Sequence, residues 1–298
     1  MKTPKFNLKL TGFSFKRVAR VLFYLAIIAT MALIWTIPWI AKVAFEELMS
    51  FEDEAGDYAM TDELTDACNV QGIELHGELT TYIPPENYDA EGNLLIDQSA
   101  SQDIVYYINQ AEQDDAIKAI VLEVDSYGGW PVAAEEVANA LRRAQKPTVA
   151  LIREGGLSAA YWAATGADTI FASKNSDVGS IGVTMSYLSY TRQNQEQGIE
   201  YVLLNSGKFK DTGDPNKPLT AEERTLMQRD IDIIYENFVQ TVAQNRGLEV
   251  KTVRNLADGS SVLGEMALEK GLIDQIGSIP EVEKYLEEKI GGKVQFCW

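Results

Sequence analysis

The sequence contains, at residues 117–154, the stretch IKAIVLEVDSYGGWPVAAEEVANALRRAQKPTVALIRE. Its first ten residues are mostly apolar and β-branched, which predicts a buried strand, and the turn YGG follows. The next segment, VAAEEVANALRRAQ (132–145), has apolar residues at helical spacing, and PTVALIRE (147–154) predicts a second strand. A strand, a helix and a strand in this order indicate a parallel pair and therefore an α/β fold.

The same alternation continues on both sides of this unit. VQGIELHGEL (70–79) predicts a strand with Ile73, Leu75 and Leu79 on one face and His76 on the polar face. Further strands are expected at 168–173 and 200–206, and further helices at 101–115 and from a Thr220–Glu223 capping box to about Asn245. The repeated order implies a mostly parallel sheet.

Charge separates the amino terminus from the rest of the chain. The first 45 residues hold seven of the 26 basic residues and none of the 44 acidic ones, while the net charge of the whole chain is −18. A surface this acidic repels the phosphate backbone of a nucleic acid. The sequence also has no cluster of basic and aromatic residues of the kind that binds nucleic acids. Nucleic acid is therefore not expected as a partner.

Residues 21–41 form an uncharged apolar run, VLFYLAIIATMALIWTIPWIA. This run is long enough to cross a bilayer as a helix and exceeds the usual apolar core of a cleaved signal peptide. Basic residues precede it and acidic residues follow it, which indicates a cytoplasmic amino terminus. We therefore expect a single-pass cell-membrane protein that contacts the lipid bilayer through residues 21–45 and has an extracytoplasmic main domain.

Four regions follow from these patterns. They are a basic cytoplasmic amino terminus at 1–20, the anchor at 21–45, an acidic linker at 46–68 and a folded domain at 69–298. The two cysteines, Cys68 and Cys297, lie near the two ends of the folded domain. Their spacing neither requires nor excludes an oxidising compartment, and two unpaired thiols are the simpler interpretation.

The chain has a single histidine, His76, which limits the available catalytic mechanisms. Triad hydrolases use imidazole as the base because it titrates near neutral pH. His76, however, lies in an expected strand, far in sequence from any serine in a tight turn. The sequence has no HExxH or CxxC motif, no second histidine for a zinc site and no GxxxxGK[ST] loop. No metal or cofactor is therefore expected.

A serine activated by a lysine remains as a possible catalytic pair. Ser158 follows two glycines and begins a helix of small residues, where the helix dipole favours developing negative charge. Lys208 and Lys210 lie in the loop NSGKFKDTGD (205–214), and burial lowers the pKa of a lysine until its neutral amine accepts a proton. Taken alone, Ser158 is typical of a helix cap and each lysine of a solvated charge.

An ordered set of motifs resembles the signal peptide peptidase A family: DSYGG, GGLSAAYW, VGSIGV, SGKFKD and LADGSSVLGEMALEKGLIDQIG. The resemblance spans about residues 70–290 and makes 69–298 a serine peptidase domain. It implies a β-α-β spiral of the Clp protease and crotonase type, preceded in this chain by one transmembrane helix. It also implies a homo-oligomeric ring whose neighbouring subunits help to complete each site.

The resemblance also implies roles for individual residues. Ser158 matches the nucleophile, Lys210 matches the general base, and the amides of Gly128 and Gly129 match the oxyanion hole. The implied supporting residues are Gly179, Ser180 and Asp211, with Ser180 orienting Lys210. The sequence departs from the family pattern at two places beside these residues. Tyr127 stands where the family has a proline, and Ala159 and Ala160 stand where it has two glycines.

The function implied by the resemblance is that of a membrane-anchored serine endopeptidase with a Ser-Lys dyad. Its substrates would be hydrophobic peptides, such as signal peptides left in the membrane after secretion. Two alternatives stay open. A crotonase-like acyl-CoA enzyme would share the oxyanion turn but would need catalytic carboxylates in its pocket, and a membrane scaffold would keep the fold without activity.

Overall fold

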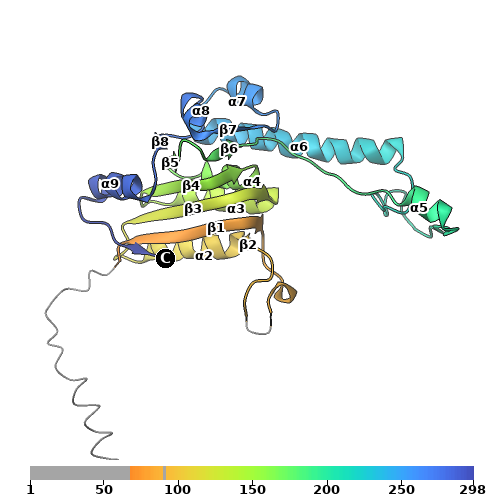
Figure 1. Cartoon of the computed structure of the whole chain (residues 1–298), viewed down its shortest axis with the longest axis horizontal. Helices are drawn as coiled ribbons and strands as arrows, with labels where there is room; N and C mark the ends of the chain where they lie inside the picture. The colour runs from red at the N-terminus through yellow and green to blue at the C-terminus, as the bar shows by residue number, and fades with distance from the viewer. Residues whose placement is uncertain (1–67, 90–91) are drawn as a thin grey trace, which may run out of the picture. The chain divides into compact units, whose positions relative to one another are not determined.

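The computed structural model describes residues 68–89 and 92–298. The expected cytoplasmic segment, the anchor and nearly all of the acidic linker lie outside the described residues. No helix among those that are described is both long and apolar enough to cross a bilayer. The described residues form one compact unit built on a mostly parallel sheet (Figure 1).

The elements follow one another along the chain largely as the sequence predicts. The strands are β1 (Val70–Thr80), β2 (Gln98–Ala100), β3 (Ala119–Gly129), β4 (Thr148–Leu157), β5 (Thr169–Ala172), β6 (Asp177–Gly179), β7 (Ser261–Leu263), β8 (Gln275–Ile276) and β9 (Phe296–Cys297). The helices are the 3₁₀ turn η1 (Pro85–Asn87), α2 (Ser101–Gln113), α3 (Pro131–Arg143), α4 (Ala159–Ala164), α5 (Thr191–Glu196), α6 (Ala221–Arg246), α7 (Val250–Leu256), α8 (Gly264–Glu269) and α9 (Ile279–Ile290).

The sheet confirms the expected α/β class. Its main order is β2-β1-β3-β4-β5-β8, and each neighbouring pair in this series is parallel. At the margins, β9 pairs in parallel with β1, and β6 pairs in parallel with β4. β7 is antiparallel to β6.

Helices cover both faces of this sheet (Figure 1). On β3, Ile120, Leu122 and Val124 belong to the core shared with α2, α3, α4 and α6. The alternate residues Ala119 and Val121 face a smaller core completed by α9. Burial on both faces explains why this strand is a continuous apolar run in the sequence.

The carboxyl ends of the central parallel strands meet at one edge of the sheet. In register, Ser126 of β3 lies opposite Gly156 of β4, and Leu157 lies opposite Gly179 of β6. Parallel sheets commonly place their functional residues at this edge because the connecting loops gather there. Ser158 follows directly after β4 and therefore lies among these strand ends.

An arm, which we define as residues 186–230, extends beyond the sheet (Figure 1). It contains α5, the connecting segment and the first turns of α6, whereas the second half of α6 packs into the core. The strand expected at 200–206 is absent, so that prediction was wrong. None of the strands in the described part of the chain pairs with this segment, and Leu204 is 93% exposed.

A disulfide bond joins Cys68 to Cys297, with the two Cα atoms 5.5 Å apart. The interpretation of two unpaired thiols was therefore wrong. Sequence separation concealed the pairing, because β9 adds to the sheet beside β1 and places Cys297 in register with Gln71. The first strand and the carboxyl-terminal strand are thus covalently linked.

Candidate active site

Ser158 occupies a strained position between β4 and α4. Its backbone has φ 52° and ψ −124°, on the positive-φ side that non-glycine residues rarely adopt. Strain of this kind costs about 1–3 kcal/mol and is concentrated at functional sites. The amide of Ser158 donates to the carbonyl of Gly179 at 2.8 Å, which fixes the turn to β6.

Two glycines bring the end of β3 against Ser158. Gly128 has φ 126°, and a Cβ atom on it would lie 2.9 Å from the Cβ of Ser158. Gly129 has φ 154°, and a Cβ atom there would lie 2.1 Å from the carbonyl oxygen of Leu79. Only glycine fits at either position, as expected for a turn that brings its backbone close to a substrate carbonyl.

The amide of Gly128 has a partner in this structure. It donates to the hydroxyl of Ser126 at 3.1 Å, and that buried hydroxyl donates to the carbonyl of Gly77 at 2.5 Å. The oxyanion hole at Gly128 and Gly129 stays a prediction. The sequence analysis did not include the amide of Ala159, the first residue of α4. A Cβ atom added to Gly128 would lie 3.4 Å from this amide nitrogen, so the amide is close to the end of β3. The first amides of a helix have no acceptor within it, which could have identified this group.

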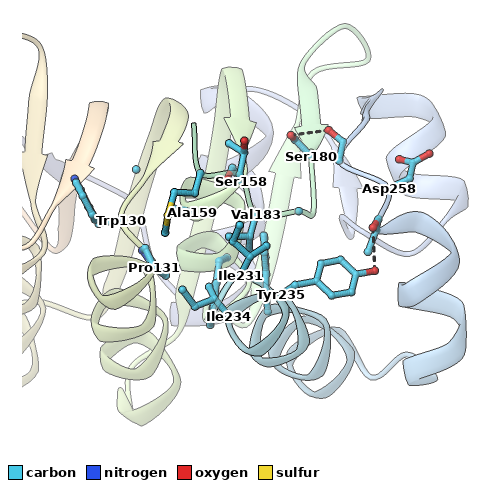
Figure 2. A pocket seen from close by; sticks show the side chains of 18 of the residues that line it. Trp130, Pro131, Ser158, Ala159, Ser180, Val183, Ile231, Ile234, Tyr235 and Asp258 are labelled. Atoms are coloured by element: carbon cyan, nitrogen blue, oxygen red, sulfur yellow. Dashed lines mark hydrogen bonds between the residues drawn. The ribbon is translucent and has the colours of Figure 1, made fainter. Parts of the chain in front are cut away.

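A cavity of about 710 Å³ opens beside Ser158 (Figure 2). Figure 2 shows Ser158 on one side and Ile231 and Ile234 of α6 on the other. Most lining side chains are apolar: Trp130, Pro131, Ala159, Trp162, Val183, Met185, Ile231, Ile234, Tyr235 and Phe238. The carboxylates of Glu78 and Asp258 also line it. Its size and lining suit an apolar side chain of a ligand.

Ser180 lies on the same cavity as Ser158 and has a positive φ of 50°. Its hydroxyl donates to the carbonyl of Gly259 at 2.9 Å (Figure 2). Its amide donates to the carbonyl of Ser260 at 3.1 Å. Gly179, with φ 100°, supplies the carbonyl that holds Ser158. The predicted wall residues Gly179 and Ser180 are therefore brought close to Ser158.

Lys210 and Asp211 are not brought to Ser158 within one chain. Both lie between α5 and α6, at the end of α6 that extends away from the sheet (Figure 1). α6 first lines the cavity at Ile231, roughly 15 Å of helix beyond its first residue, Ala221. The side chain of Lys210 is exposed, and its amide donates to the carbonyl of Gly207 at 3.0 Å.

The other polar candidates do not line the cavity beside Ser158 either. Lys208 forms an exposed ion pair with Glu222 at 2.6 Å. Nε2 of His76 lies 3.4 Å from Glu123 on β3, and His76 does not line the cavity. Tyr127 is 70% exposed and outside the cavity lining, so the replacement of proline there does not narrow the cavity.

Comparisons with known proteins identify the family of the chain. The model of peptidase family S49 matches residues 140–293. A candidate protease of Methanocaldococcus jannaschii is 37% identical over 63% of this chain and 62% of its own length. A candidate signal peptide peptidase of Enterococcus faecium is 32% identical over 63% of this chain and 56% of its own length.

The matched region thus covers less than two thirds of either relative. Among solved structures, a mutant of ClpP1 from Listeria monocytogenes aligns with 70% of this chain and 92% of its own. Its TM-score is 0.45 and its identity 12%, which is too distant to support an argument. The family match covers more than half of the chain and includes Ser158, Ser180 and Lys210. The chain therefore belongs to peptidase family S49.

Proposed function

We propose that the protein is a membrane-anchored serine endopeptidase that cleaves hydrophobic peptides, such as remnant signal peptides. One observation carries the proposal: Ser158 stands strained at a strand–helix junction, beside a glycine turn and at the edge of a largely apolar cavity. Membership in a peptidase family supports the same reaction class.

In the proposed mechanism, the hydroxyl oxygen of Ser158 attacks a peptide carbonyl. The neutral amine of Lys210 accepts the hydroxyl proton and then passes it to the leaving amine. The acyl-enzyme is hydrolysed when a water molecule, deprotonated by the same amine, attacks the ester. The ester bond then breaks, and the Lys210 ammonium returns the proton to the departing Ser158 oxygen. Amides of the Gly128–Gly129 turn and of Ala159 stabilise the oxyanion.

We further propose that Lys210 acts on Ser158 of a neighbouring copy. The arm extends away from the sheet, and Lys210, in the connection between α5 and α6, does not line the cavity of its own chain. The arm also exposes apolar side chains, among them Leu188, Val202 and Leu204. Burying such side chains against a second copy is favourable. This arrangement would also take the lysine amine out of water, which favours the neutral form that a base requires.

Labelling with a serine-directed fluorophosphonate tests the nucleophile. The wild-type protein should be labelled, Ser158→Ala should not, and Lys210→Ala should react much more slowly while remaining folded. Lys208→Ala is the matched control and should be labelled at nearly the wild-type rate. A folded, assembled wild-type protein that resists labelling would favour the inactive scaffold instead.

Mixing two inactive variants tests which copy supplies the base. If the pair forms between copies, Ser158→Ala and Lys210→Ala subunits should regain activity when mixed and reassembled. With random mixing in a ring of heterologous contacts, about a quarter of the sites would hold both intact groups. Peptide cleavage that stays absent, although native mass spectrometry shows mixed assemblies, would contradict the proposal.

The proposed location is the extracytoplasmic side of the cell membrane, with the amino terminus in the cytoplasm. The uncharged run at 21–41 and the charge asymmetry around it support an anchor. The Cys68–Cys297 disulfide is consistent with an oxidising compartment. Protease accessibility of the folded domain in intact spheroplasts tests this topology, and protection of the domain would count against it.

A further inference from the structure

The outer end of the arm, where α6 begins, is held together by charged side chains instead of an apolar core. Within residues 201–223, all of which the structure describes, Glu223 is the only buried side chain. The apolar residues nearby, such as Leu204 and Phe209, are exposed. The conformation of the segment that carries Lys210 therefore depends on polar contacts.

Glu223 is the centre of these contacts. Its carboxylate accepts hydrogen bonds from the amide and the hydroxyl of Thr220, each at 2.9 Å, and the amide of Glu223 donates back to that hydroxyl. The amine of Lys217 donates to the same carboxylate. This hydrogen bond is the largest of the causes that lower the pKa of Glu223 to about 2, so the pair stays ionised at neutral pH.

Lys217 also reaches the residue that follows Lys210. Its amine lies 3.5 Å from Oδ2 of Asp211, and the side chains of Lys217 and Asp211 are only 15% and 13% exposed. The hydroxyl of Tyr201 approaches Asp214 at 3.3 Å and Asp211 at 3.5 Å. One ammonium group thus connects the start of α6 to the turn that contains Asp211.

Removing this ammonium would leave two carboxylates close together without a cation between them. The Oδ1 atom of Asp211 is already buried without a hydrogen-bond partner. An unpaired buried charge is costly, so the turn would open to bring Asp211 into water. Because Lys210 is the adjacent residue, its side chain would move with the turn.

We propose that Lys217 is a positioning residue, which binds Glu223 and Asp211 and thereby fixes the turn from which Lys210 projects. The inference rests on the proposed function, since Lys210 matters as a base only if the protein is a Ser-Lys peptidase. Lys217 acts through Lys210 and does not touch the substrate. A displacement of about 1 Å in a catalytic group can lower a rate about 100-fold.

The test compares Lys217→Met with Lys217→Arg in the full-length protein and uses a short fluorogenic peptide. Lys217→Met should lower kcat about 100-fold and leave KM within about twofold of wild type, because the cavity-lining half of α6 is unchanged. Its fluorophosphonate labelling should slow to a similar degree. Lys217→Arg keeps a cation between the carboxylates and should recover most of kcat.

Lys208→Met is the matched control, because Lys208 pairs with Glu222 in the same segment but at the surface, with 64% and 62% of the side chains exposed. It should retain wild-type kcat. Sedimentation velocity must show that all variants keep the wild-type assembly and fold. Unchanged kcat in an intact Lys217→Met assembly would overturn the inference, as would loss of kcat without rescue by Lys217→Arg.

The same series separates failure of the positioning role from failure of the proposed function. If Ser158→Ala or Lys210→Ala stays fully active, the proposed dyad is wrong and the inference falls with it. If both are inactive while Lys217→Met matches wild type, the dyad stands and only the positioning role is rejected.

Discussion

At the scale of single residues, the site depends on how closely one backbone segment approaches another. The Cβ position of Gly128 is 3.3 Å from the hydroxyl oxygen of Ser158 and 3.4 Å from the amide of Ala159. A side chain at residue 128 would therefore occupy the space beside Ser158 in which the proposed mechanism places the carbonyl oxygen of the substrate. Removal of one oxyanion donor from a serine protease typically costs a factor of about 100 to 1,000 in kcat.

Gly128→Ala should therefore lower kcat at least 100-fold, because the added methyl group meets Ser158 and the backbone has a φ of 126°. Steady-state cleavage of a fluorogenic peptide measures the effect. Gly292→Ala is the control, since no atom lies within 4 Å of its Cβ position, and it should keep full activity. A Gly128→Ala protein with wild-type kcat would remove this turn from the mechanism.

The acid stability of the arm follows from Glu223. Hydrogen bonds from Lys217, and then from Thr220, lower the pKa of this carboxyl from its ordinary 4.5 to about 2. A lowered pKa in the folded state means that the contribution to stability is complete above pH 4.5. It is lost as the pH falls from 4.5 towards 2.

Glu223→Gln should therefore be less stable than wild type at pH 6, and the difference should shrink as the pH falls from 4.5 towards 2. Urea denaturation at a series of pH values measures it. Glu222→Gln removes an exposed carboxylate one residue away and should change stability little at any of these pH values. A Glu223→Gln difference that is constant over this range would show that the pKa is not lowered.

At the scale of elements, α6 combines two different environments in one helix. Its second half packs Phe238, Val239 and Val242 into the core, while its middle presents Ile234 to the cavity and Ile233 to solvent. The same substitution at these two adjacent isoleucines therefore distinguishes an effect on the cavity from a general effect on α6.

Ile234→Gln should lower kcat/KM for apolar peptides by about 10-fold or more, because it places an amide in the cavity and removes apolar contact area worth about 1–3 kcal/mol. Labelling by a small fluorophosphonate, which does not fill the cavity, should change much less. Ile233→Gln makes the same substitution at a side chain that is 53% exposed and should leave both rates near wild type. Equal effects at both positions would argue against the cavity as the substrate site.

Elements that depend on local sequence could be predicted, and those that depend on distant contacts could not. The capping box at Thr220 and Glu223 is formed as expected, since four consecutive residues contain all its groups. The helix after Ser158 was also correctly expected from its run of small residues, whereas Gly155 and Gly156 continue β4 and the turn lies at Ser158 itself. The prediction of a strand at 200–206 was wrong because an apolar pattern does not reveal whether a neighbouring strand exists to pair with it.

At the scale of the whole molecule, the sequence predicted the neighbourhood of only some of the candidate site residues. Ser158, Gly128 and Ser180 meet because parallel strands end at one edge, which the β-α-β order implies. Lys210 lies in the connection between α5 and α6, where Lys217 pairs with Asp211 and Glu223, and no pattern in the sequence encodes how this connection is placed relative to the sheet. The disulfide could not be predicted either, because its two cysteines are 229 positions apart and meet only because the two-residue strand β9 joins the sheet.

That disulfide gives the last prediction. Cross-linking Cys68 to Cys297 closes a loop that includes nearly the whole described domain, which restricts the unfolded chain strongly. The Cys68→Ser/Cys297→Ser variant should therefore lose about 2–5 kcal/mol in its free energy of unfolding. Urea denaturation with and without reductant measures the loss, and reductant should destabilise wild type but not the variant. Because such a bond persists only in an oxidising compartment, a wild-type protein insensitive to reductant would remove one support for the extracytoplasmic location.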